Sequence, residues 1–176
     1  CSARSQDLHD NKLSGTIPPA LGKLTALTNL DLHGNELSGT IPPSLGGLTL
    51  LTTFSLPNNQ LSGPIPPTFQ KLTQLKSLFL AKNKLTGSLP DLTRARFMRR
   101  LNLANNELTG TIPRSWGKLT SLAHLSLFAN KLSGAMPIEI GEMKSLTNLD
   151  LSKNKITGTV PPSLGKLSRA QWLVVG

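Results

Sequence analysis

The stretch Leu27-Thr-Asn-Leu-Asp-Leu-His-Gly-Asn-Glu-Leu-Ser-Gly-Thr-Ile-Pro42 contains a skeleton that returns from one end of this 176-residue chain to the other. The asparagine at position 35 recurs at intervals of 24 residues, except for one interval of 23. Its positions are Asn11, Asn35, Asn59, Asn83, Asn106, Asn130 and Asn154. A fixed period of this length is typical of a solenoid, in which each repeat buries its apolar face against its neighbours.

Within one repeat, Leu30 and Leu32 alternate with polar residues, which predicts a short strand with leucines inward and polar side chains outward. Asn35 follows the strand, and an inward asparagine in every coil can bond backbone groups of the next coil. Leu45 and Leu48 are three residues apart, the spacing of a short 3₁₀ turn on the outer side.

A single coil of this kind cannot be stable alone. Burial of an apolar side chain contributes about 1.5–3 kcal/mol, whereas ordering the backbone costs about 1–2 kcal/mol for every residue. The coils must therefore stack in register, so that their strands form a parallel sheet. Each outward position then becomes a column of side chains across that sheet.

The pattern Leu-x-x-Leu-x-Leu-x-x-Asn-x-Leu-x-Gly-x-Ile-Pro resembles the plant-type leucine-rich repeat. Ser-Gly-Thr-Ile-Pro begins at Ser14 and at Ser38, and near copies continue through the chain. These near copies begin at Ser62, Thr86, Thr109, Ser133 and Thr157. In that family, which includes plant receptor-kinase ectodomains and polygalacturonase-inhibiting proteins, the coils make a curved solenoid whose inner face recognises ligands.

The fold class predicted from the pattern and the resemblance is an α/β-type repeat solenoid. We expect a curved, right-handed leucine-rich repeat coil with a parallel concave β-sheet and short 3₁₀ turns on the convex side. Residues 1–176 should form one domain of about seven 24-residue repeats and a partial eighth.

The ends of the chain depart from the resembled family, whose extracellular members carry disulfide-bonded caps. Ala3 and Gln6 stand where leucines are expected, and the last unit stops at Val175, so both ends are expected to be uncapped. The single cysteine, Cys1, cannot form an intramolecular disulfide, and its position is interpreted as a processed or excised chain end, with lipidation as the alternative. If these ends are native, we expect end-to-end association with another copy, because an unpaired strand edge such as Trp172 to Val175 invites pairing.

Localisation is left open by these features. The resemblance favours a secreted or cell-surface protein, but no asparagine lies in an Asn-x-Ser/Thr acceptor and no disulfide is available. A secreted microbial effector or a cytoplasmic protein is the alternative. No apolar run approaches the roughly 20 residues of a membrane span.

The chain is strongly basic, with 19 Lys and Arg against 9 Asp and Glu, a net charge of +10. Such a field favours acidic partners, anionic glycans or nucleic acid, but lysines on solvated turns explain it equally well. Nucleic acid is disfavoured because basic residues and aromatics are not interleaved along a groove. The lysines fall into two columns, one of Lys12, Lys84, Lys131 and Lys155 and one of Lys23, Lys71, Lys118 and Lys166.

Two aromatic residues, Phe79 and Phe128, fall on outward strand positions in the middle of the chain. Aromatic rings and arginine are common anchors of interfaces, although isolated apolar residues on a surface are also normal. We predict a cationic and aromatic patch across the fourth to sixth units as the partner-binding site. Its residues are Phe79, Lys82, Arg100, Asn102, Asn105, His124, Ser126 and Phe128.

The fourth unit is one residue short and carries the densest basic run, from Asp91 to Arg100. An irregular unit in a repeat array can mark a functional site. The alternative is a deletion tolerated on the outer face, where loops accept changes easily.

Asp7, His9, Asp31 and His33 form a two-by-two grid on the strand face. Paired histidines and aspartates can bind a transition metal or transfer protons. We predict no metal site, because a metal needs ligands that converge more closely than a flat strand surface provides. His9 next to His33 could still make binding sensitive to pH.

The function predicted is a recognition module without enzymatic activity, cofactor or catalytic residue, which binds a protein or peptide through its concave face. The serines are mostly turn or strand-face repeats, and no Gly-rich phosphate loop or paired-cysteine motif occurs. The alternative is an anionic-polysaccharide binder similar to polygalacturonase inhibitors. A minor alternative is an ice-binding surface along Thr16, Thr40, Thr111 and Thr159, which Pro64 and Ala135 interrupt.

Overall fold

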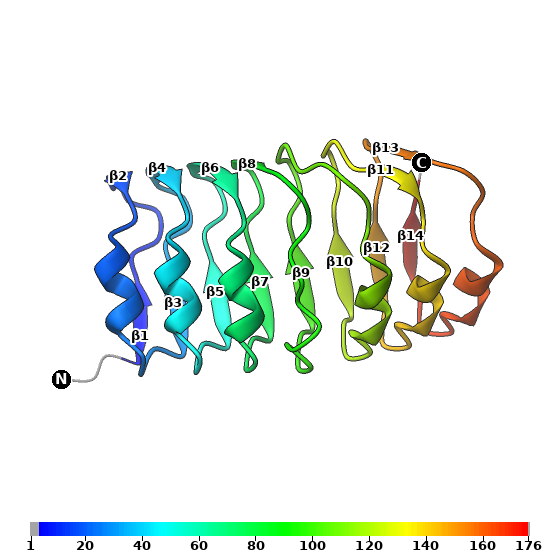
Figure 1. Cartoon of the computed structure of the whole chain (residues 1–176), viewed down its shortest axis with the longest axis horizontal. Coiled ribbons are helices and arrows are strands. Elements are labelled where there is room, and N and C mark those ends of the chain that lie inside the picture. The colour runs from blue at the N-terminus through cyan, green and yellow to red at the C-terminus, as the bar shows by residue number, and fades with distance from the viewer. Residues whose placement is uncertain (1–3, 176) are drawn as a thin grey trace.

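The computed structural model describes residues 4–175 as a row of coils stacked side by side, with the two termini at opposite ends (Figure 1). Each coil contributes a strand to one long sheet, and most coils carry a short helix on the opposite side. The predicted fold class, a leucine-rich repeat solenoid with a parallel sheet and outer 3₁₀ turns, is confirmed. Cys1 and Ala3 lie outside the described residues.

The long sheet contains eight parallel strands in the order of the chain, one from each coil. Its strands are β1 (Ser5–Asp7), β3 (Asn29–Asp31), β5 (Thr53–Ser55), β7 (Ser77–Phe79), β9 (Arg100–Asn102), β10 (His124–Ser126), β12 (Asn148–Asp150) and β14 (Trp172–Val174). The predicted register is confirmed, because Arg100 pairs with Ser77 on one side and with His124 on the other.

Two smaller parallel sheets lie beyond the long sheet, where the Ser-Gly-Thr segment turns the chain. One contains β2 (Ser14–Thr16), β4 (Glu36–Thr40), β6 (Gln60–Pro64) and β8 (Lys84–Thr86), and the other contains β11 (Ser133–Ala135) and β13 (Lys155–Thr157). Glycine is required here for two reasons. Gly39 has a φ of 73°, and a Cβ at this position would lie 2.9 Å from the Cγ2 of Thr16 in the preceding coil.

Six coils carry a 3₁₀ helix within the described residues. These helices are η1 (Pro19–Lys23), η2 (Pro43–Gly47), η3 (Pro67–Lys71), η4 (Arg114–Lys118), η5 (Ile138–Glu142) and η6 (Pro162–Lys166). The leucines at spacing three close each turn: the Leu45 N–H donates to the Pro42 carbonyl at 3.0 Å, and the Leu48 N–H donates to the Leu45 carbonyl at 3.1 Å. Among these helices none has the length or apolarity to cross a bilayer.

The fourth coil has turns instead of a helix between β8 and β9, at the place where the sequence is one residue short. Larger side chains flank it, because the helix position held by Leu45 is occupied by Phe69 in the third coil and by Trp116 in the fifth. Both rings are 1% exposed, and the Trp116 indole N–H donates to the Pro90 carbonyl of the fourth coil at 3.1 Å. The deletion is therefore placed on the outer side, and the core remains continuous across it.

A ladder of buried asparagines connects the coils. The Asn59 Oδ1 accepts from the Leu37 N–H at 3.0 Å, and its amide donates to the carbonyls of Leu32 at 3.0 Å and Leu56 at 3.2 Å. The sequence predicted bonds from this asparagine to the next coil, and this prediction is wrong. Asn59 instead bonds the Leu37 N–H and the Leu32 carbonyl, which belong to the preceding coil. The same contacts to the preceding coil recur at Asn35, Asn83, Asn106, Asn130 and Asn154.

We predict that Asn59→Ala destabilises the fold far more than Asn11→Ala. The Asn59 change leaves the Leu37 N–H in the core without its side-chain acceptor, and such a group costs about 1–3 kcal/mol. The Leu32 carbonyl also loses this donor but keeps the amide of Asn35 at 3.1 Å. Asn11 is exposed and bonds only carbonyls of its own coil, Leu8 at 3.2 Å and His9 at 2.8 Å. Urea unfolding followed by circular dichroism would measure the difference, and equal losses would contradict the structural role of the ladder.

Candidate functional site

The concave face consists of the side chains that point away from the core along the eight-stranded sheet. Its two main columns follow the strand pairing and confirm the predicted registers. One column is Ser5, Asn29, Thr53, Ser77, Arg100, His124, Asn148 and Trp172. The other is Asp7, Asp31, Ser55, Phe79, Asn102, Ser126, Asp150 and Val174.

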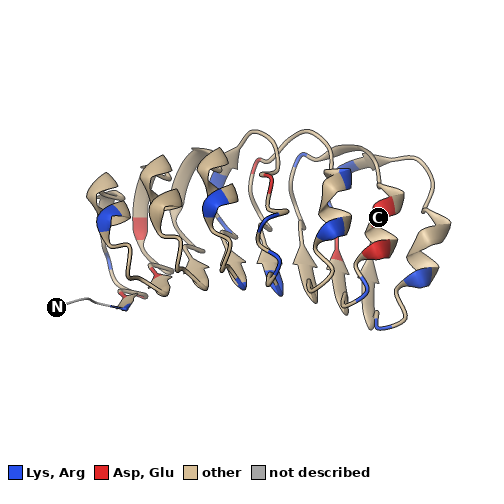
Figure 2. Cartoon of the chain, turned by 60° about the horizontal axis from the view of Figure 1, so that its bottom comes forward, with Lys and Arg blue, Asp and Glu red and all other residues tan. Residues whose placement is uncertain are grey.

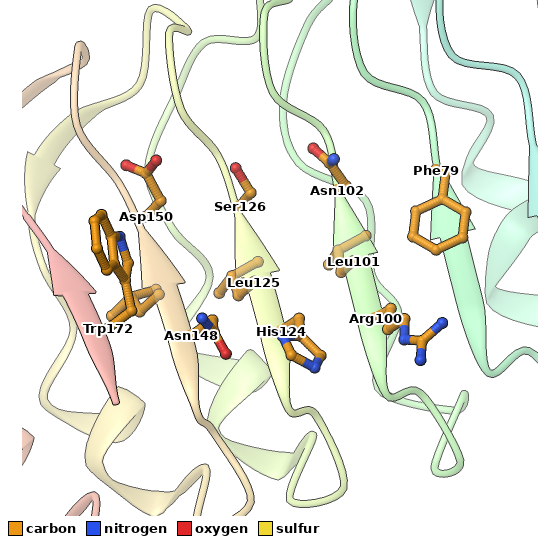
Figure 3. Close-up of a pocket in the computed structure, with 11 residues that line it drawn as sticks. Phe79, Arg100, Leu101, Asn102, His124, Leu125, Ser126, Asn148, Asp150 and Trp172 are labelled. Carbon is orange, nitrogen blue, oxygen red and sulfur yellow. The ribbon is translucent and has the colours of Figure 1, made fainter. Parts of the chain in front are cut away.

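A hollow of about 480 Å³ lies on this face between β7 and β14 (Figure 3). Leu101, Leu125 and Leu149 form its floor, at the central position of three successive strands. Figure 3 shows Phe79 at one end and Trp172 at the other. The remaining lining residues are Arg100, Asn102, His124, Ser126, Asn148 and Asp150.

Charge is distributed unevenly within the hollow. Arg100 and His124 are neighbours on β9 and β10, whereas Asp150 lies two strands from Arg100, on β12 near Trp172. The Asp150 Oδ1 accepts from the backbone N–H of Ser152 at 3.0 Å and from its hydroxyl at 2.7 Å. These bonds hold the carboxylate in place before any ligand arrives.

Five of the eight residues predicted from the sequence line the hollow, namely Phe79, Arg100, Asn102, His124 and Ser126. The other three, Lys82, Asn105 and Phe128, lie outside it, in the turns that follow the strands. The Phe128 ring is half-buried, and the ammonium group of Lys153 lies 5.1 Å from its centroid. The ring is therefore already in contact with a cation of its own chain.

Sequence reasoning missed Trp172, Asn148 and Asp150 as lining residues. The signal for Trp172 was available, because it continues the column of His124 and Asn148 at the same interval of 24 residues. It was interpreted only as part of an exposed strand edge.

The turn after each of the first seven strands of the long sheet adopts a left-handed conformation, which sequence reasoning also missed. Lys82 has a φ of 56° and Asn105 a φ of 54°. The residues at this turn position form a column that includes glycine and asparagine, the residue types that most readily adopt positive φ, and this composition is the signal that could have indicated it. The other members are Asp10, Gly34, Asn58, Ala129 and Lys153.

A second group of polar side chains lies at the N-terminal end of the concave face. The rings of His9 and His33 stack with centroids 4.6 Å apart and planes 7° from parallel. The Nδ1 atom of each histidine bonds the aspartate two residues earlier, His9 to Asp7 and His33 to Asp31, the latter at 2.8 Å. The hydrogen bond between Asp7 and His9 lowers the pKa of the Asp7 carboxyl and raises the pKa of the His9 imidazole from their ordinary values.

The reason given above against a metal site is contradicted by Asp10. Its carboxylate Oδ2 lies 3.5 Å from the His33 Nε2. Metal-ligating atoms of His9, Asp10 and His33 all lie within 4.8 Å of one another. The ligands converge because Asp10 sits in the left-handed turn beyond the strand, with a φ of 51°, instead of on the flat strand surface.

Comparison with known proteins identifies the family. The family model for the Leucine Rich Repeat matches residues 7–24, 26–48, 50–72, 74–94, 97–119 and 145–167, which together make up most of the chain. The chain therefore belongs to the leucine-rich repeat family. No curated protein sequence matched it.

Solved structures of plant receptor ectodomains are closely similar. The ectodomain of the receptor kinase GASSHO1/SCHENGEN3 from Arabidopsis thaliana, in complex with CASPARIAN STRIP INTEGRITY FACTOR 2, is 36% identical with a TM-score of 0.96, over 98% of this chain and 21% of that chain. The ectodomain of the Arabidopsis receptor kinase HAESA, in complex with an N-terminally extended IDA peptide hormone ligand, is 36% identical with a TM-score of 0.90, over 93% of this chain and 28% of that chain. This chain thus spans less than a third of either ectodomain.

A plant ice-binding protein is also similar, at 29% identity and a TM-score of 0.70, over 96% of this chain and 62% of that chain. Taken together, the family and its neighbours support a ligand-binding module. The leucine-rich repeat ectodomain fold is typically a non-enzymatic binding module.

We predict that His9 titrates above its ordinary pKa of 6.5 and that Asp7→Asn moves the pKa down towards it. The attraction between the two side chains requires a protonated His9 and an ionised Asp7. It is therefore lost as the pH rises through the pKa of His9, and also as the pH falls through the pKa of Asp7. Heteronuclear NMR of the imidazole Cε1–H group would follow the titration, with the His124 signal from a distant coil as an internal reference. An unchanged His9 titration in the variant would contradict the contact.

Proposed function

We propose that the chain is a recognition module that binds a peptide in extended conformation across the hollow between β7 and β14. The observation that carries this proposal is the hollow itself, which has aromatic side chains at both ends and fixed polar groups between them. The similarity to the receptor ectodomain solved with a peptide hormone supports the same type of ligand.

The dimensions of the sheet suit a short peptide. Five strands line the hollow, and neighbouring strands in a sheet are about 4.8 Å apart, so the hollow spans about 19 Å. An extended peptide advances about 3.3 Å for each residue, so about six residues fill this length. Because the face is preformed on a stacked sheet, binding costs little conformational entropy of the protein, and a few anchors can provide most of the affinity.

The charges give the peptide a direction. Arg100 carries a permanent positive charge and offers a fork of donors for a carboxylate, with His124 beside it. Asp150 lies two strands away, a separation of about 10 Å, and would pair with a basic or amino group. The preferred ligand therefore carries an acidic group and a basic group about three residues apart, with apolar side chains reaching Phe79 and Trp172.

The test is selection of peptides of about ten residues from a random library on the immobilised chain, followed by affinity measurement on variants. We predict that Phe79→Ala and Trp172→Ala each weaken binding of the selected peptides by about 30-fold, equivalent to the roughly 2 kcal/mol of a typical anchor. Phe97→Ala is the matched control, because Phe97 is 54% exposed but lies outside the hollow, in the loop before β9. Failure to select any peptide, or equal losses in all three variants, would overturn the proposal.

The same affinity measurement tests whether Phe128, which the sequence predicts as an anchor, contacts the peptide. The affinity of the selected peptides is measured for Phe128→Ala, after circular dichroism has shown that this variant folds. A loss as large as that of Phe79→Ala would extend the site beyond the hollow to the turn after β10. An unchanged affinity would restrict the site to the hollow residues.

Ice binding is the second candidate function, favoured by the similarity to the plant ice-binding protein. Thr16, Thr40, Thr111 and Thr159 are exposed along one edge of the coils, although Pro64 breaks the row. We predict that any ice activity depends on this row, so that thermal hysteresis of the chain falls in a Thr40→Lys variant. A chain without thermal hysteresis eliminates this candidate.

The anionic-glycan and end-to-end association hypotheses have weaker support. Basic residues are unevenly distributed along the row of coils (Figure 2), because no Lys or Arg lies between Lys23 and Lys71. Two lysines of the columns are paired with glutamates, Lys131 with Glu107 at 2.7 Å and Lys166 with Glu142 at 3.3 Å. Self-association rests only on exposed side chains at the last strand, of which Trp172 is 59% exposed. Trp172 is also a lining residue of the hollow, so its exposure fits peptide binding equally well.

A further inference from the structure

The histidine and aspartate group at the N-terminal end of the concave face has the features of a metal site. It lies on the coils of β1 and β3, two strands away from the hollow that begins at β7. This inference is therefore independent of the peptide proposal.

Each of the two imidazoles has one ring nitrogen held by a carboxylate. The Nδ1 of His33 bonds the Asp31 carboxylate at 2.8 Å, and that of His9 bonds Asp7 in the same way. Metal-binding histidines usually donate their other ring N–H to a carboxylate, which fixes the tautomer and leaves the opposite nitrogen as the ligand. The same bonding pattern leaves the Nε2 atom of each ring as the candidate ligand, and the rings, stacked 7° from parallel, must turn towards each other to share one ion.

The third ligand depends on a glycine. A Cβ at Gly34 would lie 2.0 Å from the Asp10 Oδ1, so only glycine at this position leaves room for the carboxylate to extend over the second coil towards His33. In the later coils the same position carries a side chain. These residues are Asn58, Lys82, Asn105, Ala129 and Lys153.

We propose that His9, Asp10 and His33 bind a divalent transition-metal ion, Zn²⁺ by preference, through two imidazole Nε2 atoms and one carboxylate oxygen. Two nitrogens and one oxygen are a typical donor set for zinc, and three protein ligands leave a fourth position open for water or an external ligand. The carboxylates of Asp7, Asp10 and Asp31 also supply local negative charge in a chain whose net charge is +10.

The separation of the ligands requires a local movement on binding. Zinc–ligand bonds of about 2.0–2.2 Å in a tetrahedral site place the ligand atoms about 3.3–3.6 Å apart. The three groups lie within 4.8 Å, and the most exposed of them is Asp10, whose side chain is 69% exposed. Rotation of the Asp10 side chain and of the two imidazole rings would bring the ligand atoms together.

The test is titration of the untagged chain with Zn²⁺ in competition with a chromophoric chelator, with Cys1→Ser present throughout so that its thiol does not compete. We expect one ion for each chain. His9→Ala and His33→Ala should each weaken binding at least tenfold, and Asp10→Asn should weaken it measurably. His124→Ala is the matched control for the metal, because it removes the remaining one of the three histidines, which lies in the hollow, and it should leave the Zn²⁺ affinity unchanged.

A second measurement avoids substitution. Addition of paramagnetic Co²⁺ to the same chain should broaden the imidazole NMR signals of His9 and His33 at one equivalent and leave that of His124 sharp. Absence of stoichiometric Zn²⁺ binding, equal loss in His124→Ala, or broadening of all three histidines together would overturn the proposal.

Discussion

The buried asparagine that bonds the backbone of the preceding coil is the interaction on which the rest of the structure depends. Asn59 accepts from the Leu37 N–H, a donor that the turn would otherwise leave unpaired in the core, and it donates to the Leu32 carbonyl of the preceding coil. Its repetition fixes how far apart successive coils lie and in which register. The register aligns the outward side chains into columns, and these columns form the hollow.

The period and the leucine pattern were sufficient to predict the coil, the parallel sheet and the columns, because these follow from local spacing repeated along the chain. They also placed Phe79, Arg100 and His124 together. What the sequence could not predict depends on contacts between coils. The reach of Asp10 towards His33 requires the left-handed turn and Gly34, and the inclusion of Trp172 requires that the sheet continue in register to β14. Neither is visible in a single repeat.

The short fourth coil illustrates how a repeat array absorbs an irregularity. The missing residue removes the outer helix, while Trp116 from the fifth coil bonds the Pro90 carbonyl and fills the core below it. On the other side of the same coil, β7 keeps its pairing with both neighbours. The concave face is thus protected from the change, and this coil contributes Phe79 to the hollow despite its shortened outer segment.

Small, neutral side chains on β5 separate the two polar groups of the concave face. Thr53 and Ser55 lie between the histidine pair of the first two coils and the hollow that begins with Phe79. In a stack where each coil contacts only its neighbours, energetic coupling weakens with every intervening coil, and effects at sites more than about 7–10 Å apart are usually additive. One continuous sheet can therefore present two chemically distinct surfaces that behave as separate modules, each free to change without altering the other.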